Sequence, residues 1–207
     1  MNKKDTVVFD LDGTLLDTLE DLKNSVNYAM TQCGYPEHTL DEVRRYVGNG
    51  ILLLMQRAIP GGKDDPNFDK AFTLFKEHYG KHCNDTTKPY AGIMKLLHTL
   101  KENNIKIAIV SNKADFAVKE LNAIYFKDLI PVAIGEKESE GIRKKPAPDT
   151  VIEALKQLGS TAENSVYIGD SDVDIETARN SREINLYAIV SGKFQAGVCS
   201  GKSFSRT

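Results

Sequence analysis

Two carboxylates stand two residues apart near the start of the sequence. Asp10 and Asp12 belong to the pentad DLDGT, which directly follows the apolar run TVVF at residues 6–9. In a parallel sheet, ligands bind beyond the carboxyl ends of the strands. Because alternate residues of an extended segment point the same way, both carboxylates can approach one substrate. Asp before Gly is also common in turns and helix caps, so the pentad alone leaves that structural role open.

A second polar group follows the apolar run at residues 105–110. The tripeptide Ser111, Asn112 and Lys113 offers a small hydroxyl and backbone N–H groups, which can bind phosphate oxygens near a helix start. The same tripeptide could instead cap a helix that begins near Ala114. Both interpretations place it at the end of a predicted strand.

A basic loop, RKKPAPD at residues 143–149, supplies a third group. Its two prolines limit the freedom of the backbone through their fixed φ values, which favours a defined position for Lys145. A positioned lysine can neutralise a bound phosphate together with the carboxylate that attacks it. Arg143 and Lys144 are interpreted as solvated members of the loop.

An acidic cluster, GDSDVD at residues 169–174, follows a further apolar run at 166–168. Mg²⁺ prefers carboxylate and water oxygens, so the cluster suits this hard divalent cation. Three aspartates so close together repel one another unless a cation is present. The alternative is a helix N-terminus with acids in its first turn, and Asp172 fits that role.

The elements that must position these groups follow from the hydrophobic pattern. Apolar runs rich in Val and Ile lie at residues 6–11, 105–110, 129–134, 166–168 and 186–190. Segments of helical period lie between most of them, at 92–101, 114–122 and 150–158. Strands that alternate with helices predict a doubly wound, parallel-sheet α/β core of the Rossmann-like kind.

One stretch breaks the alternation. From about Asp17 to about Asp85 the pattern is helical throughout, and the run PGGKDDPN at 60–67 is its clearest internal loop. We therefore predict an α-helical cap at residues 17–85, inserted into a core made of residues 1–16 and 86–207.

Composition limits the classes of partner. The 207 residues carry 27 Lys and Arg against 29 Asp and Glu, so a net charge of -2 gives no reason to expect nucleic acid or a membrane surface as a partner. Three cysteines without a CxxC pair, and the lack of a signal-like or membrane-spanning apolar run, predict a cytoplasmic protein. We expect a small-molecule ligand and a monomer or dimer.

In this order, the four groups resemble the motifs of the haloacid dehalogenase-like hydrolase superfamily. The matching segments are DLDGTLLDT at 10–18, SNK at 111–113, KPAPD at 145–149 and GDSDVDIETA at 169–178. The helical insert resembles the α-helical cap of that superfamily. Within it, YVGNG at 46–50 with Leu53, Arg57 and Ala58, and the segment 89–113, are similar to the phosphoglycolate phosphatases.

This resemblance implies a chemical role for each carboxylate. Asp10 would attack phosphorus and form an aspartyl phosphate. Asp12 would act first as a general acid and then as a general base. Mg²⁺ would be bound by the Asp10 carboxylate, the Asp12 backbone carbonyl and Asp170, with Asp174 helping directly or through water.

The resemblance also implies a set of substrate-binding residues. Ser111, Asn112 and Lys145 would hold the phosphoryl oxygens, with Thr14 supporting the motif loop. The Gly48, Asn49 and Gly50 turn would reach from the cap toward the leaving group, although it could equally be an ordinary turn between helices. Arg57 could meet a substrate carboxylate or be solvated.

The substrate implied is a small phosphorylated metabolite, and the similarity of the cap favours 2-phosphoglycolate. Three alternatives stay open: a phosphatase for another small phosphate ester or pyrophosphate, a phosphoglucomutase relative, and a non-catalytic phosphate-binding regulatory domain. A carbon–halogen hydrolase is less favoured, because that chemistry does not require a second carboxylate at position 12.

Two further patterns lie outside these motifs. His78, His82 and Cys83 could share a helix face as a zinc site, but no fourth ligand suggests itself and a partly exposed helix face is favoured. The tail from Ser191 does not resemble the usual ending of the superfamily and is predicted to be loop. Its run AGVCSGKS at 196–203 resembles a P-loop only superficially, because Ala196 replaces the required glycine.

Overall fold

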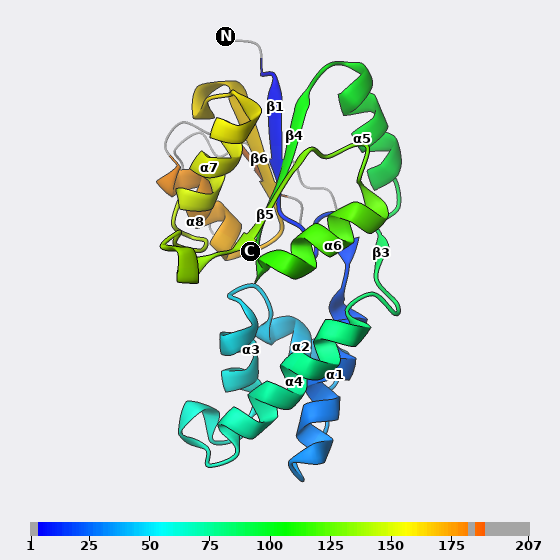
Figure 1. Ribbon diagram of the computed structural model, residues 1–207, viewed down its shortest axis with the longest axis vertical. Helices are drawn as coiled ribbons and strands as arrows, with labels where there is room; N and C mark the ends of the chain where they lie inside the picture. The colour runs from blue at the N-terminus through cyan, green and yellow to red at the C-terminus, as the bar shows by residue number, and fades with distance from the viewer. Residues whose placement is uncertain (1–3, 182–184, 189–207) are drawn as a thin grey trace, which may run out of the picture.

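A five-stranded parallel sheet forms the centre of the protein (Figure 1). The computed structural model describes residues 4–181 and 185–188, the last four by their backbone alone. The strands are β1 (Thr6–Phe9), β4 (Lys106–Ala114), β5 (Val132–Glu136), β6 (Ser165–Gly169) and β7 (Asn185–Ala188). Their order is β5-β4-β1-β6-β7, and every neighbouring pair runs parallel.

Helices cover both faces of this sheet. They are α5 (Ile93–Glu102), α6 (Asp115–Tyr125), α7 (Asp149–Leu158) and α8 (Asp172–Asn180). Within β1, Phe9 packs into one core cluster with residues of α5 and α6, while Val8 packs into another with residues of α7 and α8. Successive strand residues point to opposite faces, so both faces are apolar and both are buried. The predicted doubly wound α/β core is confirmed.

Four helices between β1 and β4 form a separate apolar cluster. They are α1 (Leu19–Gln32), α2 (Leu40–Tyr46), α3 (Ile51–Ala58) and α4 (Phe68–His82). A reciprocal capping box between Thr39 and Glu42 starts α2. In Figure 1 this helical unit lies beyond the carboxyl ends of β1, β4 and β6. The inserted α-helical cap is present, whereas its predicted boundaries at 17 and 85 stay a prediction.

The chain passes between sheet and cap through two short antiparallel strands. Leu16 of β2 (Leu16–Asp17) pairs with Pro89 of β3 (Lys88–Pro89). The buried carboxylate of Asp21, in the first turn of α1, accepts hydrogen bonds from the backbone N–H and hydroxyl groups of both Thr86 and Thr87 at 2.6–3.1 Å. The segment that enters the cap and the segment that leaves it are therefore hydrogen-bonded to each other.

Several element boundaries differ from the sequence predictions. Strand β4 continues to Ala114, so the SNK tripeptide lies inside this strand instead of after it. Strand β5 begins at Val132, and Leu129 before it is a core residue outside the strand. Short 3-10 helices occupy Gly62–Asp64, within the predicted 60–67 loop, and Glu138–Glu140 and Ala162–Asn164 elsewhere.

The expected strand at 186–190 is seen from Asn185 to Ala188, and residues 189–190 lie outside the described part of the chain. The tail from Ser191 and its P-loop-like run also lie outside the described residues. Among the helices of residues 4–181, none combines the length and apolar character that a membrane crossing needs.

Candidate active site

The loop after β1 carries both carboxylates of the DLDGT pentad. The N–H of Asp10 donates to the Ile168 carbonyl at 2.8 Å, which continues the pairing of β1 with β6. Gly13 turns the chain with a φ of +83°, a backbone conformation that favours glycine. A Cβ at Gly13 would lie 2.2 Å from Oδ2 of Asp170, so the loop can approach this second carboxylate only because position 13 has no side chain.

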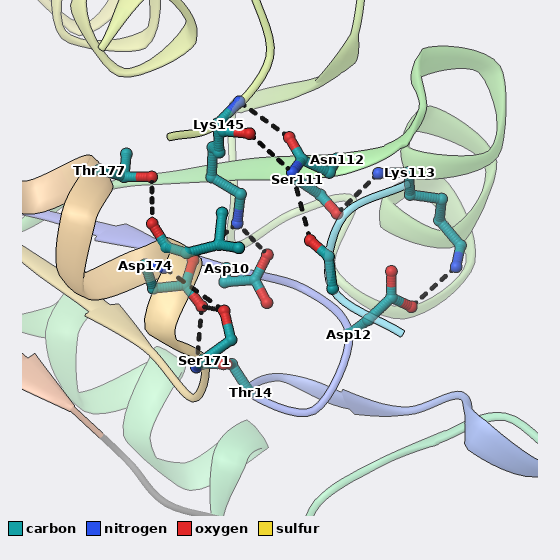
Figure 2. A network of polar contacts seen from close by, with 12 residues as sticks. Asp10, Asp12, Thr14, Ser111, Asn112, Lys113, Lys145, Ser171, Asp174 and Thr177 are labelled. Carbon is teal, nitrogen blue, oxygen red and sulfur yellow. Dashed lines mark hydrogen bonds and ion pairs between the residues drawn. The ribbon is translucent and has the colours of Figure 1, made fainter. Parts of the chain in front are cut away.

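Lys145 lies between two of the aspartates (Figure 2). Its ammonium is 2.6 Å from Asp10 Oδ1 and 2.7 Å from Asp174 Oδ1, and all three side chains are buried. The hydroxyl of Tyr167 donates to the same oxygen of Asp174 at 2.8 Å. Burial alone would lower the pKa of Lys145, but the Asp10 carboxylate raises it well above its usual value, so the lysine is a cation.

Three carboxylates meet beside this lysine. Asp10, Asp170 and Asp174 each offer an oxygen, and these oxygens lie within 4.8 Å of one another. Burial and then the neighbouring carboxylates outweigh Lys145 and raise the pKa of Asp10. Burial, reinforced by Asp174, raises the pKa of Asp170 to about 6. A divalent cation would relieve both effects, because it compensates the buried negative charge.

The donor set fits Mg²⁺, since it consists of carboxylate oxygens. The three aspartates are not equivalent. Oδ1 of Asp174 already accepts from Lys145 and Tyr167, and Oδ2 accepts from the backbone N–H and hydroxyl of Ser171. Its many donors lower the pKa of Asp174 despite its burial. Asp10 and Asp170 therefore have the more available oxygens, and Asp174 orients the groups around them.

Asp12 is held by two donors that reach the same oxygen. The Thr18 hydroxyl lies 2.6 Å and the Lys113 ammonium 2.7 Å from Oδ1. Within residues 4–181, no protein donor reaches the other oxygen, Oδ2. Burial would lower the pKa of Lys113, but Asp12 and Tyr79 raise it, so it stays charged. Asp12 thus has one fixed oxygen and one available for a reacting group.

The predicted phosphate-binding residues divide into two kinds. Ser111 lines the cavity, and its hydroxyl accepts from the N–H of Lys113 at 3.2 Å. Asn112 also lines the cavity, but its amide is engaged on both ends: Oδ1 accepts from the Lys145 N–H at 2.8 Å, and Nδ2 donates to the carbonyls of Lys145 and Gly48. Asn112 therefore fixes the lysine loop and touches the cap.

Thr14 and the cap turn are placed differently. Thr14 is buried behind Asp170, with its hydroxyl 3.5 Å from Oδ1 of that residue, and does not line the cavity. Gly48 and Gly50 do line it. The Asn49 side chain instead accepts from Arg57 at 3.0 Å, and Arg57 also donates to the Tyr46 carbonyl. Arg57 therefore braces the turn and is neither free nor in the cavity.

A cavity of about 320 Å³ joins these groups between sheet and cap. The core contributes Asp10, Asp12, Ser111, Asn112, Lys145 and Asp170, all of them predicted from the sequence. The cap contributes the apolar side chains of Leu22, Ile51 and Leu54. A mixed cavity of this size, polar at one end, suits a small ligand.

Sequence reasoning missed five residues here: Lys113, Thr18, Tyr167, Arg44 and Tyr90. Lys113 was part of a recognised tripeptide, and its charge beside two polar residues was an available signal. Nothing local distinguished the others. At the alternative zinc site, the rings of His78 and His82 stack at 4.3 Å, and His78 Nδ1 pairs with the Ser25 hydroxyl. Within the described residues, Asp10, Asp170 and Asp174 form the one potential metal cluster.

Comparison with known proteins identifies the family of this chain. The family model for haloacid dehalogenase-like hydrolases matches residues 7–188. A phosphoglycolate phosphatase from Aquifex aeolicus is 32% identical, over 84% of this chain and 80% of the relative. One from Pseudomonas putida is 31% identical over 84% of this chain, which spans 65% of that longer relative.

Solved structures show the same fold. A crystal structure from Lactobacillus delbrueckii subsp. bulgaricus, provisionally assigned as a phosphoglycolate phosphatase, superposes with a TM-score of 0.81 at 36% identity. The superposition covers 90% of this chain and 86% of the Lactobacillus chain. A haloacid dehalogenase-like hydrolase from Streptococcus pneumoniae has a TM-score of 0.78 at 19% identity, covering 91% and 85%. The chain therefore belongs to the haloacid dehalogenase-like hydrolase family, as a phosphatase that resembles the phosphoglycolate phosphatases.

Proposed function

We propose that this phosphatase hydrolyses a small phosphate monoester through an aspartyl phosphate on Asp10. The observation that carries the proposal is the position of the Lys145 ammonium, 2.6 Å from Asp10 Oδ1 at the buried end of the cavity. A cation at this point offsets the repulsion between an attacking carboxylate and a phosphate dianion. Within residues 4–181 no protein donor reaches Asp10 Oδ2, which is the oxygen available for attack.

The two carboxylates of the pentad divide the reaction into two steps. In the first, Asp10 forms a bond to phosphorus, the ester P–O bond breaks, and Asp12 gives its proton to the leaving alkoxide. In the second, Asp12 takes a proton from water, which attacks phosphorus and releases phosphate from Asp10. Lys113 and Thr18 hold Asp12 by one oxygen throughout, so its other oxygen can exchange the proton.

Asp10 and Asp170, with the Asp12 backbone carbonyl, would hold Mg²⁺, and Asp174 would orient them. Bound there, the ion would supply charge neutralisation between the carboxylates and the phosphoryl oxygens. Ser111 and Lys145 line the same end of the cavity and would bind those oxygens. Asn112 would contribute by fixing the lysine loop, because its amide is already engaged.

The substrate we propose is 2-phosphoglycolate. Support comes from the names of the relatives and from the small cavity, which would have to hold the phosphoryl group and its alcohol together. The cap lies over the leaving-group end through Gly48, Gly50 and Ile51, and so would shape the choice of alcohol.

Hydrolysis of an aryl phosphate by the pure protein, with and without Mg²⁺, tests the reaction. We expect turnover that a chelator abolishes and Mg²⁺ restores. Asp10→Asn is expected to abolish turnover and retain the fold, seen by circular dichroism. The exposed Asp128 offers a matched control, because Asp128→Asn removes one charge far from the cavity. Persistent activity of Asp10→Asn would overturn the assignment of the nucleophile.

The substrate requires a separate comparison. Values of kcat/KM for 2-phosphoglycolate, a sugar phosphate, a nucleotide and pyrophosphate report how strongly each transition state is bound. The proposal expects the highest value for 2-phosphoglycolate. A higher kcat/KM for another ester would mean that this ester, and not 2-phosphoglycolate, is the preferred substrate, and would leave the proposed mechanism unchanged.

A further inference from the structure

The cavity contains an arginine that the proposed chemistry does not use. Arg44 lies in the last turn of α2, on the cap side of the cavity, where the lining residues from Leu19 to Leu54 are otherwise apolar or glycine. Tyr90 lines the same cavity from the core side, where it directly follows β3. Two hydrogen-bond donors, Arg44 from the cap and Tyr90 from the core, thus line the same cavity.

The charges of the cavity distinguish Arg44 from the other cations. Lys113 and Lys145 are buried and lie within 2.7 Å of the carboxylates of Asp12 and Asp10, so their charges are already compensated. Arg44 has a half-exposed side chain, and its ion pair is with Asp41 one turn earlier on the same helix. The Asp41 side chain is 73% exposed. Exposed pairs at this spacing contribute little to stability, so Arg44 can turn to a ligand at small cost.

Tyr90 is better fixed than Arg44. Its backbone N–H donates to the Leu15 carbonyl at 3.1 Å, and its ring packs against the core cluster beneath α5. Burial and then the carboxylates of Asp17 and Asp170 raise the pKa of Tyr90 to about 12. The hydroxyl therefore stays protonated at neutral pH and can donate a hydrogen bond to an anion.

From this arrangement we propose that Arg44 and Tyr90 form a second anion site, which selects phosphate esters whose alcohol carries a carboxylate. The site extends the phosphatase activity proposed above and rests on it. A guanidinium presents two parallel N–H donors that match a carboxylate, and a tyrosine hydroxyl adds a third from a different direction. An ester without the second anion leaves Arg44 paired with Asp41 and gains nothing from this end of the cavity.

The test compares 2-phosphoglycolate with 2-hydroxyethyl phosphate, in which a neutral hydroxymethyl group replaces the carboxylate. The measured quantity is the ratio of their kcat/KM values. We expect the wild type to prefer 2-phosphoglycolate, Arg44→Gln to reduce the ratio at least tenfold, and Tyr90→Phe to reduce it severalfold. Arg45→Gln is the matched control, because Arg45 is exposed on the same helix and does not line the cavity, and it is expected to keep the wild-type ratio.

Each contrary result has a distinct meaning. Hydrolysis of both esters at equal efficiency by the wild type, or an equal loss of both in Arg44→Gln, would overturn the second anion site and leave the phosphatase proposal intact. If ethane-1,2-diol bisphosphate is hydrolysed faster than 2-phosphoglycolate and the difference depends on Arg44, the second anion of the preferred substrate is a phosphate and not a carboxylate. If neither ester is hydrolysed, the proposed function fails, and calorimetric binding of 2-phosphoglycolate to wild type and Arg44→Gln still decides the site: equal affinities would overturn it.

Discussion

The Lys113 ammonium lies 2.7 Å from Asp12 Oδ1 and 5.0 Å from the centre of the Tyr79 ring. Lys113 comes from β4, the neighbour of the central strand β1, whereas Tyr79 comes from α4 of the cap, and both are buried. One cation therefore connects the cap to the carboxylate that we assign as general acid and base. It acts as a positioning residue, because its ammonium is engaged by Oδ1 of Asp12.

Replacing Lys113 tests this role through the leaving group. We expect Lys113→Met to reduce kcat for an alkyl phosphate by roughly tenfold to a hundredfold, and for p-nitrophenyl phosphate much less, because only a basic leaving group needs a well-placed acid. Lys113→Arg, which keeps the charge, should recover part of the loss. Equal losses for both esters would show that Lys113 supports the fold or the phosphate site instead of Asp12.

The unequal environments of the carboxylates lead to a prediction about metal. Asp170 has fewer protein donors than Asp174, so it is the better ligand of the two. We expect Asp170→Asn to raise the Mg²⁺ concentration for half-maximal activity by roughly tenfold or more. Asp172→Asn, two residues away and outside the cavity, serves as the control. An unchanged Mg²⁺ titration in Asp170→Asn would exclude Asp170 as a ligand.

The sequence predicts those parts of the site that lie at strand ends. Asp10 and Asp170 are predicted because each lies at the end of an apolar run, and parallel strands bring their carboxyl ends to one edge. The same logic predicted the sheet with its helices on both faces. Lys145 is predicted for a different reason, because Pro146 and Pro148 restrict the loop that carries it. These features depend on local pattern and on chain topology, which one sequence carries.

Features that depend on how the cap packs could not be predicted. Arg44 and Arg45 are adjacent residues of the same type, and only the packing of α2 places the first in the cavity and the second outside it. Asp21 looks like an ordinary acid in the first turn of a helix, yet it is buried against threonines 65 and 66 residues later in the chain. Long-range contacts of this kind leave no periodic signal.

Asp21 also leads to a prediction about stability. Its carboxylate accepts five hydrogen bonds from Thr86 and Thr87, and removing it leaves backbone N–H groups without partners. We expect Asp21→Ala to lower the free energy of unfolding by about 2 to 3 kcal/mol in urea denaturation. Glu20→Ala is the control, since the partly exposed Glu20 forms an i,i+3 ion pair with Lys23, and it should cost less than about 1 kcal/mol. Similar effects of both would mean that the linker contact contributes little.

Three aromatic rings stack on one another in the cap, and the middle ring belongs to His78, which can titrate. His78 stacks between Tyr28 and His82 at centroid distances of 4.4 and 4.3 Å, and its Nδ1 pairs with the Ser25 hydroxyl at 3.0 Å. Burial, together with the charge of His82, lowers the pKa of His78 below its usual 6.5. Asp85 opposes this effect and Lys81 adds to it.

A lowered histidine pKa makes the folded protein sensitive to acid. Well above pH 6.5 His78 is neutral in both the folded and the unfolded chain. As the pH falls through 6.5 the unfolded chain binds a proton first, so stability decreases until the pH passes the lower pKa of the folded state. We expect the loss of unfolding free energy between about pH 7.5 and about pH 5.5 to be smaller in His78→Gln than in the wild type. His98→Gln, at an exposed position on α5, should keep the wild-type loss, and parallel curves for all three proteins would show that His78 does not contribute.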